Sequence, residues 1–183
     1  MKNIETYTLF DPNNMTKGWP VDKAGNYIVL LRPGVMLPDN IIKTQPVFET
    51  LIYRDIEYRV LYTGISKDSL YKRVIKIHLL GNNAGKSTLR KSLGCLWGYK
   101  FVPRDKNQLS QKTKYNDEDE RKITLWMRKN LLFLSVGNYN PDSDEQELID
   151  TFNPPLNLQN NNNLVNIEFR KQLSRLRAKK IGE

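Results

Sequence analysis

GNYIVLLRPG (residues 25–34) and IYRDIEYRVLYTG (residues 52–64) are the two stretches that decide the fold of this chain. The first is a short apolar run with glycine at each end, a pattern that predicts a β-strand. The second is longer and rich in β-branched and aromatic residues, so it predicts a strand or a hairpin arm. Two strands that follow each other in this way indicate a sheet.

Helical spacing follows directly after the second strand. From about residue 67 to residue 80, apolar side chains recur on one stripe, formed by Leu70, Val74 and Ile77. Three further elements are expected, a helix, a buried strand and a helix, at residues 117–131, 131–138 and 142–152. This order predicts an α/β fold, in which a small and mainly antiparallel sheet is flanked by helices.

The length of 183 residues suits one compact domain with a sizeable core. Residues 1–24 are rich in turn signals and are expected to form a lead-in. The domain itself is expected over residues 25–160. Residues 161–183 predict a basic C-terminal helix that packs on the domain or extends it, and its charged face is either solvated or part of a binding surface.

The charge balance is strongly basic. Lys and Arg number 29 against 20 Asp and Glu, which gives a net charge of +9. This balance favours a polyanionic partner, although solubility alone explains part of it. Nine tyrosines and three tryptophans are interleaved with the basic residues, a pattern that suits nucleic acid better than a membrane surface. No apolar run approaches the length of a membrane-spanning helix.

Cysteine and histidine are too scarce for several common kinds of site. Cys95 is alone and cannot form an internal disulfide, so a reducing, cytoplasmic setting is expected. His78 is the one histidine of the chain. One cysteine and one histidine are too few for a structural zinc site of the usual Cys/His kind. Any bound metal must therefore be a hard cation held by carboxylate and water.

GNNAGKST (residues 81–88) looks at first like a phosphate-binding P-loop. That motif requires four residues between its glycines, but only three lie between Gly81 and Gly85, and Leu80 stands where the first glycine should be. The stretch also follows a predicted helix, whereas a P-loop follows a strand. A nucleotide-binding function is therefore the weakest alternative. We interpret the stretch as a Gly/Asn turn that opens a helix at Ser87.

Two charged side chains lie beside apolar stripes. On a helix, Glu145 shares a face with Leu148 and Ile149, so one carboxylate points with the core-facing stripe. It either requires a cation or pairs with a surface arginine at the edge of the stripe. Arg73 flanks the stripe of the first helix, where it is either an ordinary edge residue or a ligand for phosphate.

Taken together, these residues resemble the GIY-YIG nuclease family. Gly25-Asn26-Tyr27 stands where the family has Gly-Ile-Tyr, and Tyr62-Thr63-Gly64 stands where it has Tyr-Ile-Gly. Arg73 follows Tyr62 by eleven residues, as the family's helix arginine does. Glu145 matches the metal-binding glutamate, with Asn157 twelve residues further on. The resemblance covers roughly residues 25–160.

The resemblance implies an endonuclease that hydrolyses DNA phosphodiester bonds with one divalent metal, Mg²⁺ or Mn²⁺. Tyr27 would act as the base or orient the water, which requires nearby cationic charge to lower its pKa. Arg73 would supply that charge and stabilise the phosphate. Tyr62 would hydrogen-bond to the phosphate or to Tyr27, and Glu145 would bind the metal.

Besides Asn26 and Thr63, which replace the two isoleucines of the family motifs, the sequence departs from the family pattern in two further places. Between Tyr27 and Tyr62 lie 34 residues, which implies an insertion around residues 34–57. The family histidine often lies four residues after the arginine, where this chain has Ile77, and His78 comes one residue later. On a regular helix, that shift turns His78 to the other flank.

Several further residues are candidate contacts to DNA. This set consists of Lys67, His78, Lys86, Arg90, Lys91 and Asn157, although Asn157 is expected to close the fold more than to touch substrate. A catalytically silent DNA-binding module of the same fold is the main alternative to the enzyme. The sequence leaves the oligomeric state open.

Overall fold

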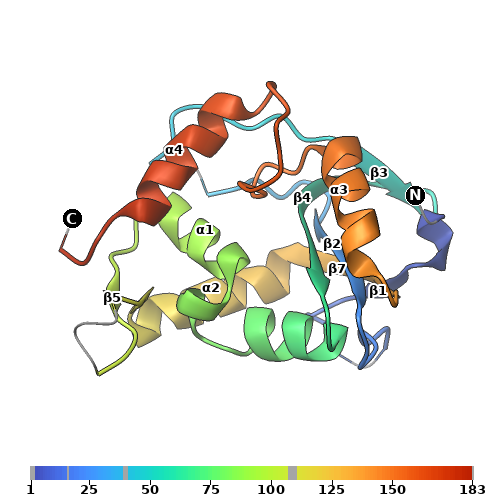
Figure 1. The fold of residues 1–183 in the computed structure, drawn as a ribbon, viewed down its shortest axis with the longest axis horizontal. Helices are drawn as coiled ribbons and strands as arrows, with labels where there is room; N and C mark the ends of the chain where they lie inside the picture. Colours follow the sequence, from blue (N-terminus) through green and yellow to red (C-terminus); the bar gives the residue numbers. More distant parts are fainter. Residues whose placement is uncertain (1–2, 16, 39–40, 107–110, 183) are drawn as a thin grey trace.

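The computed structural model describes residues 3–15, 17–38, 41–106 and 111–182. Its main sheet has the strand order β1-β7-β2-β4-β3, and all neighbouring strands are antiparallel. Helices cover both faces of this sheet (Figure 1). The predicted α/β fold with a mainly antiparallel sheet is therefore confirmed. The strands are β1 (Thr8–Phe10), β2 (Gly25–Leu31), β3 (Thr50–Tyr53), β4 (Ile56–Ser66) and β7 (Leu131–Gly137).

Strand β2 divides its side chains between two hydrophobic layers, as a pleated strand does. Tyr27 and Val29 belong to one layer, and Ile28 and Leu30 belong to the other. Four helices pack on the first layer, namely η2 (Lys72–Leu79), α1 (Thr88–Leu96), α2 (Asp117–Asn130) and α4 (Ile167–Ala178). Helix α3 (Pro141–Phe152) packs on the second. Tyr27 therefore points toward the helical layer that contains η2.

The lead-in and the insertion both contribute strands. The lead-in holds a short 3₁₀ helix, η1 (Ile4–Thr6), and then β1, which extends the sheet by pairing with β7. The predicted insertion contains β3, which forms a hairpin with the first half of β4. The hairpin turn, Arg54-Asp55, has positive φ at both residues, the conformation of the type I′ turns that suit a right-twisted hairpin.

The helix expected at residues 67–80 has an unusual form. Its Lys72–Leu79 segment is a π-helix, in which hydrogen bonds join residues five apart. The N–H of Leu80, for example, donates to the carbonyl of Ile75 at 2.9 Å. Residues five apart therefore lie closer to one face of η2 than they would in an α-helix.

The loop after η2 leads into α1. A 3₁₀ turn, η3 (Ala84–Lys86), is followed by α1, whose first turn is capped by Ser87 Oγ accepting from the N–H of Arg90 at 3.2 Å. The interpretation of GNNAGKST as a turn that opens a helix at Ser87 agrees with this geometry. A small hairpin of β5 (Val102–Pro103) and β6 (Thr113–Lys114) follows.

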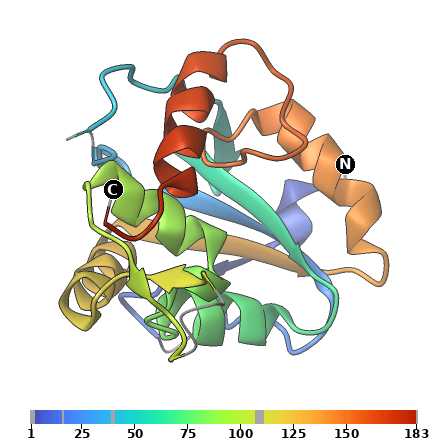
Figure 2. The ribbon, with the colours of Figure 1, turned by 60° about the vertical axis from the view of Figure 1, so that its left-hand side comes forward.

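The C-terminal helix α4 lies beside α1 (Figure 2). It buries Phe169 and Leu173, and the Arg170 guanidinium is also buried, donating to Asn153 Oδ1 at 2.9 Å. Across the described part of the chain, no helix has both the length and the apolar character that a bilayer crossing requires.

Candidate active site

Tyr27 and Gly64 face each other across the β2–β4 pair. A Cβ atom at position 64 would lie only 2.5 Å from the Tyr27 phenol oxygen, so the glycine provides the room that the ring occupies. The segment Tyr62-Thr63-Gly64 therefore does two things at once: it presents Tyr62 and makes space for Tyr27. The side chain of Tyr27 is completely buried.

His78 is brought to Tyr27 by the π-helix. Its Nε2 atom lies 2.7 Å from the Tyr27 phenol oxygen, and its Nδ1 atom lies 2.6 Å from Ser87 Oγ. The expectation that His78 turns to the other flank is wrong, because it assumed a regular helix. The expectation that His78 contacts DNA is also wrong for this structure, since its side chain is fully buried.

Both members of this pair are electrically neutral near pH 7. Burial, and then the neighbouring Tyr62, raise the pKa of Tyr27 well above its ordinary value, and the charge of Arg73 does not outweigh them. Burial also lowers the pKa of His78 well below its ordinary value, and the charges of Arg73 and Arg90 add to this effect. Arg73 acts on the pKa of Tyr27 in the expected direction, but the expectation that this charge brings the pKa below its ordinary value is wrong for this structure.

Tyr62 and Arg73 lie at the edge of the buried pair. The Tyr62 ring centroid is 6.1 Å from that of Tyr27, and the half-buried Tyr62 phenol lies 3.2 Å from Thr88 Oγ1. Arg73 Nη1 donates to the carbonyl of Lys86 at 3.3 Å, and its buried Nε has no hydrogen-bond partner within the described residues. Burial lowers the pKa of Arg73, but the two phenols outweigh it and raise that pKa. The guanidinium is thus held beside the phenols and has no ion-pair partner in the part of the chain that the structure describes.

Glu145 and Tyr62 line the same cavity, which has a volume of about 430 Å³. Glu145 is half-buried, and it forms no hydrogen bond or ion pair with any residue that the structure describes. Burial, and then the charge of Asp142, raise the pKa of its carboxyl, whereas Lys67 and Arg73 act in the opposite direction. The alternative of a simple pairing with a surface arginine is thus absent here.

The residues at this cavity fit a hard divalent cation. Among the described residues, no cluster of three metal-binding side chains is present. Mg²⁺ does not need one, because it commonly keeps several waters and takes one or two carboxylates together with substrate phosphates. A half-buried carboxylate that faces the cavity without a cationic hydrogen-bond partner is the donor that such a cation requires.

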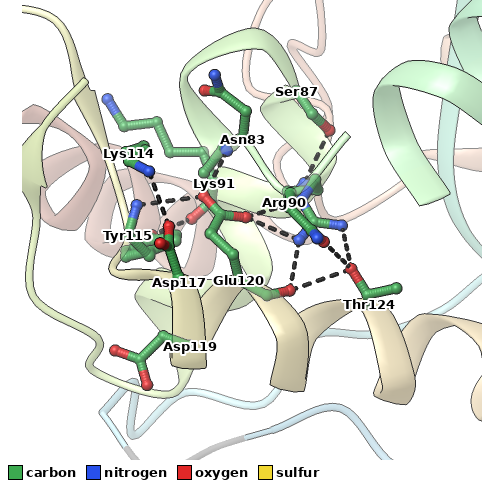
Figure 3. A network of polar contacts seen from close by, with 12 residues as sticks. Asn83, Ser87, Arg90, Lys91, Lys114, Tyr115, Asp117, Asp119, Glu120 and Thr124 are labelled. Carbon is green, nitrogen blue, oxygen red and sulfur yellow. Dashed lines mark hydrogen bonds and ion pairs between the residues drawn. The ribbon is translucent and has the colours of Figure 1, made fainter. Parts of the chain in front are cut away.

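Arg90 is a correction to the candidate DNA contacts. Its side chain is fully buried and forms an ion pair with Glu120, with Nη2 at 2.7 Å and Nε at 2.9 Å from Oε2 (Figure 3). It therefore offers nothing to a phosphate. Glu120 was not singled out from the sequence, although a signal existed. It precedes Ile123 by three residues and Met127 by seven, so it lies on the buried face of its helix.

The Arg90–Glu120 ion pair lies behind the site and connects the segments that surround it. Arg90 Nη1 donates to the carbonyl of His78 at 2.9 Å. Glu120 Oε1 accepts from the N–H groups of Ala84 at 2.6 Å and Tyr115 at 3.2 Å. These contacts join η2, the loop after it and α2 (Figure 3). They fix the segment that carries His78 and Ser87.

The other candidate DNA contacts take different positions. Asn157 is buried, and its side chain forms two hydrogen bonds with the backbone of Thr63 in β4. It accepts from the N–H of Thr63 and donates to its carbonyl, both at 2.9 Å. It closes the fold beside Tyr62, as expected. Lys67 is exposed and paired with Asp142 at 2.9 Å, and Lys86 is exposed at the end of η3. Lys91 is half-buried and lines the cavity of Tyr62 and Glu145.

Comparison with protein families matches residues 25–179 to the GIY-YIG catalytic domain. The match spans most of the chain and includes β2, β4, η2, α3 and α4, so this protein belongs to the GIY-YIG family. Its domain is that of a nuclease. Searches of curated proteins and of solved structures found no match.

Proposed function

We propose that this protein is a divalent-metal-dependent endonuclease that hydrolyses phosphodiester bonds of DNA. The observation that carries the proposal is that Tyr62 and Glu145 line one cavity, with Arg73 and the Tyr27–His78 pair directly behind Tyr62. These side chains come from β2, β4, η2 and α3. A protein that only binds DNA has no need of a half-buried carboxylate at this position.

Glu145 is the proposed metal ligand. Its carboxylate would hold Mg²⁺ or Mn²⁺, with water and a phosphate oxygen completing the coordination. When bound, the cation polarises the phosphate and stabilises the leaving oxygen. The raised pKa of Glu145 is consistent with this role, because a nearby divalent cation would favour the ionised carboxylate that burial disfavours.

The two tyrosines are proposed to manage the proton of the attacking water. Tyr62 reaches the cavity, so its phenol orients the water or takes its proton from that side. Tyr27 is a neutral, buried phenol, and it receives the proton from the Tyr62 side while passing its own to Nε2 of His78. His78 can accept there if its Nδ1–H donates to Ser87 Oγ. Tyr27 thus assists the water through its neighbours rather than as a free phenolate.

Arg73 is proposed to stabilise the charge that develops on the phosphate. Its guanidinium is already held beside both phenols, and it forms no ion pair with a carboxylate among the described residues. A fixed positive charge that is oriented before the reaction begins contributes without reorganisation. Its planar donors also match the geometry of phosphate oxygens.

The experiment is plasmid nicking. We expect the wild-type protein to convert supercoiled plasmid to the open-circular form with Mg²⁺ or Mn²⁺ and not with EDTA. Glu145→Gln should abolish nicking. The matched control is Glu147→Gln, the same change two residues further along α3 at an exposed position, which should nick like the wild type.

Two outcomes would contradict the proposal. If Glu145→Gln nicks as fast as the wild type, the metal site is elsewhere. If the wild type binds the plasmid but does not nick it with either metal, the protein is the catalytically silent DNA-binding module.

A further inference from the structure

Two cationic side chains also line the cavity of Tyr62 and Glu145. Lys91 projects from α1 and Arg177 from α4, and both belong to the cavity wall. The hydroxyl-bearing Thr88 and Ser174 come from the same two helices. The cavity is therefore bounded by α3 with its carboxylate and by two helices that carry cations.

Neither cation is paired with a carboxylate of the described residues. Within the part of the chain that the structure describes, neither Lys91 nor Arg177 forms an ion pair, and the only aromatic contact of Lys91 is the ring of Phe101, 4.8 Å away. Both side chains are half-buried. Burial lowers the pKa of Lys91, and the charge of Arg177 lowers it further, so the two cations are close enough to repel each other.

Such an arrangement is unfavourable until an anion arrives. Two like charges that are partly removed from water repel each other more strongly than they would in solvent. An anion between them relieves this repulsion and gains charge-assisted hydrogen bonds. Solubility alone does not explain the pair, because cations that serve solubility lie on exposed surface rather than in a cavity wall.

We propose that Lys91 and Arg177 bind a second phosphodiester of the DNA strand, next to the phosphate that is placed at Tyr62 and Glu145. The proposal rests on the proposed nuclease function and makes α4 part of the substrate cleft. The cavity volume of about 430 Å³ admits a short stretch of one strand. It lies within the roughly 300–1,000 Å³ of ordinary ligand sites, so it takes phosphates of one strand of a duplex and leaves the rest of the duplex outside.

The test measures binding without cleavage. A fluorescein-labelled duplex oligonucleotide is titrated with the 183-residue chain in EDTA at several NaCl concentrations, and anisotropy gives the affinity. Arg177→Gln and Lys91→Gln should each weaken binding about tenfold and lower the slope of log affinity against log salt by about one. Arg177→Lys, which keeps the charge, should restore most of the affinity.

The matched control is Lys171→Gln, which removes one charge from an exposed position of the same helix, where Lys171 pairs with Glu168 at 2.9 Å. It should weaken binding clearly less than Arg177→Gln. Thermal melting gives an independent readout. Arg177→Gln should melt at the same temperature as the wild type or higher, because it removes a repulsion. If Arg177 instead had a structural role, the variant would melt at a lower temperature than the wild type.

The results separate the two proposals. If the wild type nicks plasmid but Arg177→Gln binds no more weakly than Lys171→Gln, the cation pair is not a phosphate site, while the nuclease function stands. If the wild type never nicks but Arg177→Gln and Lys91→Gln lose affinity as stated, the phosphate site stands and the nuclease function fails. A wild type that does not bind the duplex overturns the phosphate site.

Discussion

The Nε2 atom of His78 lies 2.7 Å from the phenol oxygen of Tyr27, and the π-helical form of η2 is what places it there. Arg73 and His78 are five residues apart, and a π-helix turns such residues closer to one face than an α-helix does. An unusual helix thus compensates for a histidine that stands one position later than the family pattern. Single π turns inside helices are frequent at functional sites.

The first prediction concerns the phenol of Tyr27. Tyr27→Phe keeps the ring but removes the hydroxyl that contacts His78, and nicking should slow by about 10²-fold or more, the scale of proton-transfer catalysis. The rate is measured by plasmid nicking with Mg²⁺. Tyr53→Phe is the control, because it also removes a buried phenol, one that donates to the carbonyl of Tyr7 at 3.0 Å on the opposite layer. Equal losses in both variants would indicate a general packing effect.

The second prediction concerns stability and pH. The pKa of His78 is held well below its ordinary 6.5 by burial in the folded protein. As pH falls below about 6.5, the unfolded chain binds a proton at this side chain that the folded protein does not, so stability rises with pH in this window and is lost as pH falls. The free energy of unfolding should therefore decrease by up to about 1.4 kcal/mol per pH unit from this one group.

The chain offers a clean control for this measurement. His78 is its one histidine, so His78→Gln removes all imidazole titration. Urea unfolding at pH 5 and pH 7 should show a larger difference in stability for the wild type than for His78→Gln. The same difference in both proteins would mean that carboxylates, not the buried imidazole, set the acid sensitivity.

Much of this architecture could be predicted from the sequence, because it follows from local patterns. The strands containing Tyr27 and Tyr62 are apolar or β-branched runs, and Glu145 lies on a helical stripe beside Leu148 and Ile149. The spacing of apolar residues that predicts each of these elements can be seen directly in the sequence. Those elements are present where the sequence predicts them.

What could not be predicted depends on tertiary packing. The predicted stripe of Leu70, Val74 and Ile77 assumed an α-helix. In η2, Ile77 is only partly buried and His78 is buried in its place, so the position of His78 could not be fixed from spacing. Arg90 carries the same charge as a DNA-binding arginine, and only the approach of Glu120 from α2 makes it a core residue. β1 is a three-residue strand, too short to be recognised by alternation, and it is stabilised by its pairing with β7.

The third prediction concerns the effect of the Glu145 carboxylate on stability and on metal binding, measured without an activity assay. Burial raises the pKa of this group, so keeping it ionised near pH 7 destabilises the folded protein. Glu145→Gln should therefore melt at the same temperature as the wild type or higher in EDTA. Millimolar Mg²⁺ or Mn²⁺ should raise the melting temperature of the wild type and not that of Glu145→Gln. An equal metal-induced shift in both proteins would place the cation at another carboxylate.

The last prediction concerns the buried ion pair of Arg90 and Glu120. Both side chains are fully buried, and removing one partner leaves the other charge unpaired in the core. Arg90→Met should therefore reduce the free energy of unfolding by about 3–5 kcal/mol. Glu120→Gln should cost a similar amount, because its amide oxygen can still accept from Ala84 but the buried Arg90 charge loses its carboxylate. Urea denaturation of the two single variants and the double variant forms a double-mutant cycle.

The double variant should be more stable than the sum of the single losses implies, with a coupling of up to about 3 kcal/mol. Because Arg90 also donates to the carbonyl of His78, Arg90→Met should slow nicking even at temperatures where the protein remains folded. Strictly additive losses would show that the two side chains stabilise the fold independently. In that case the ion pair would not be what holds η2 and the His78–Tyr27 contact in place.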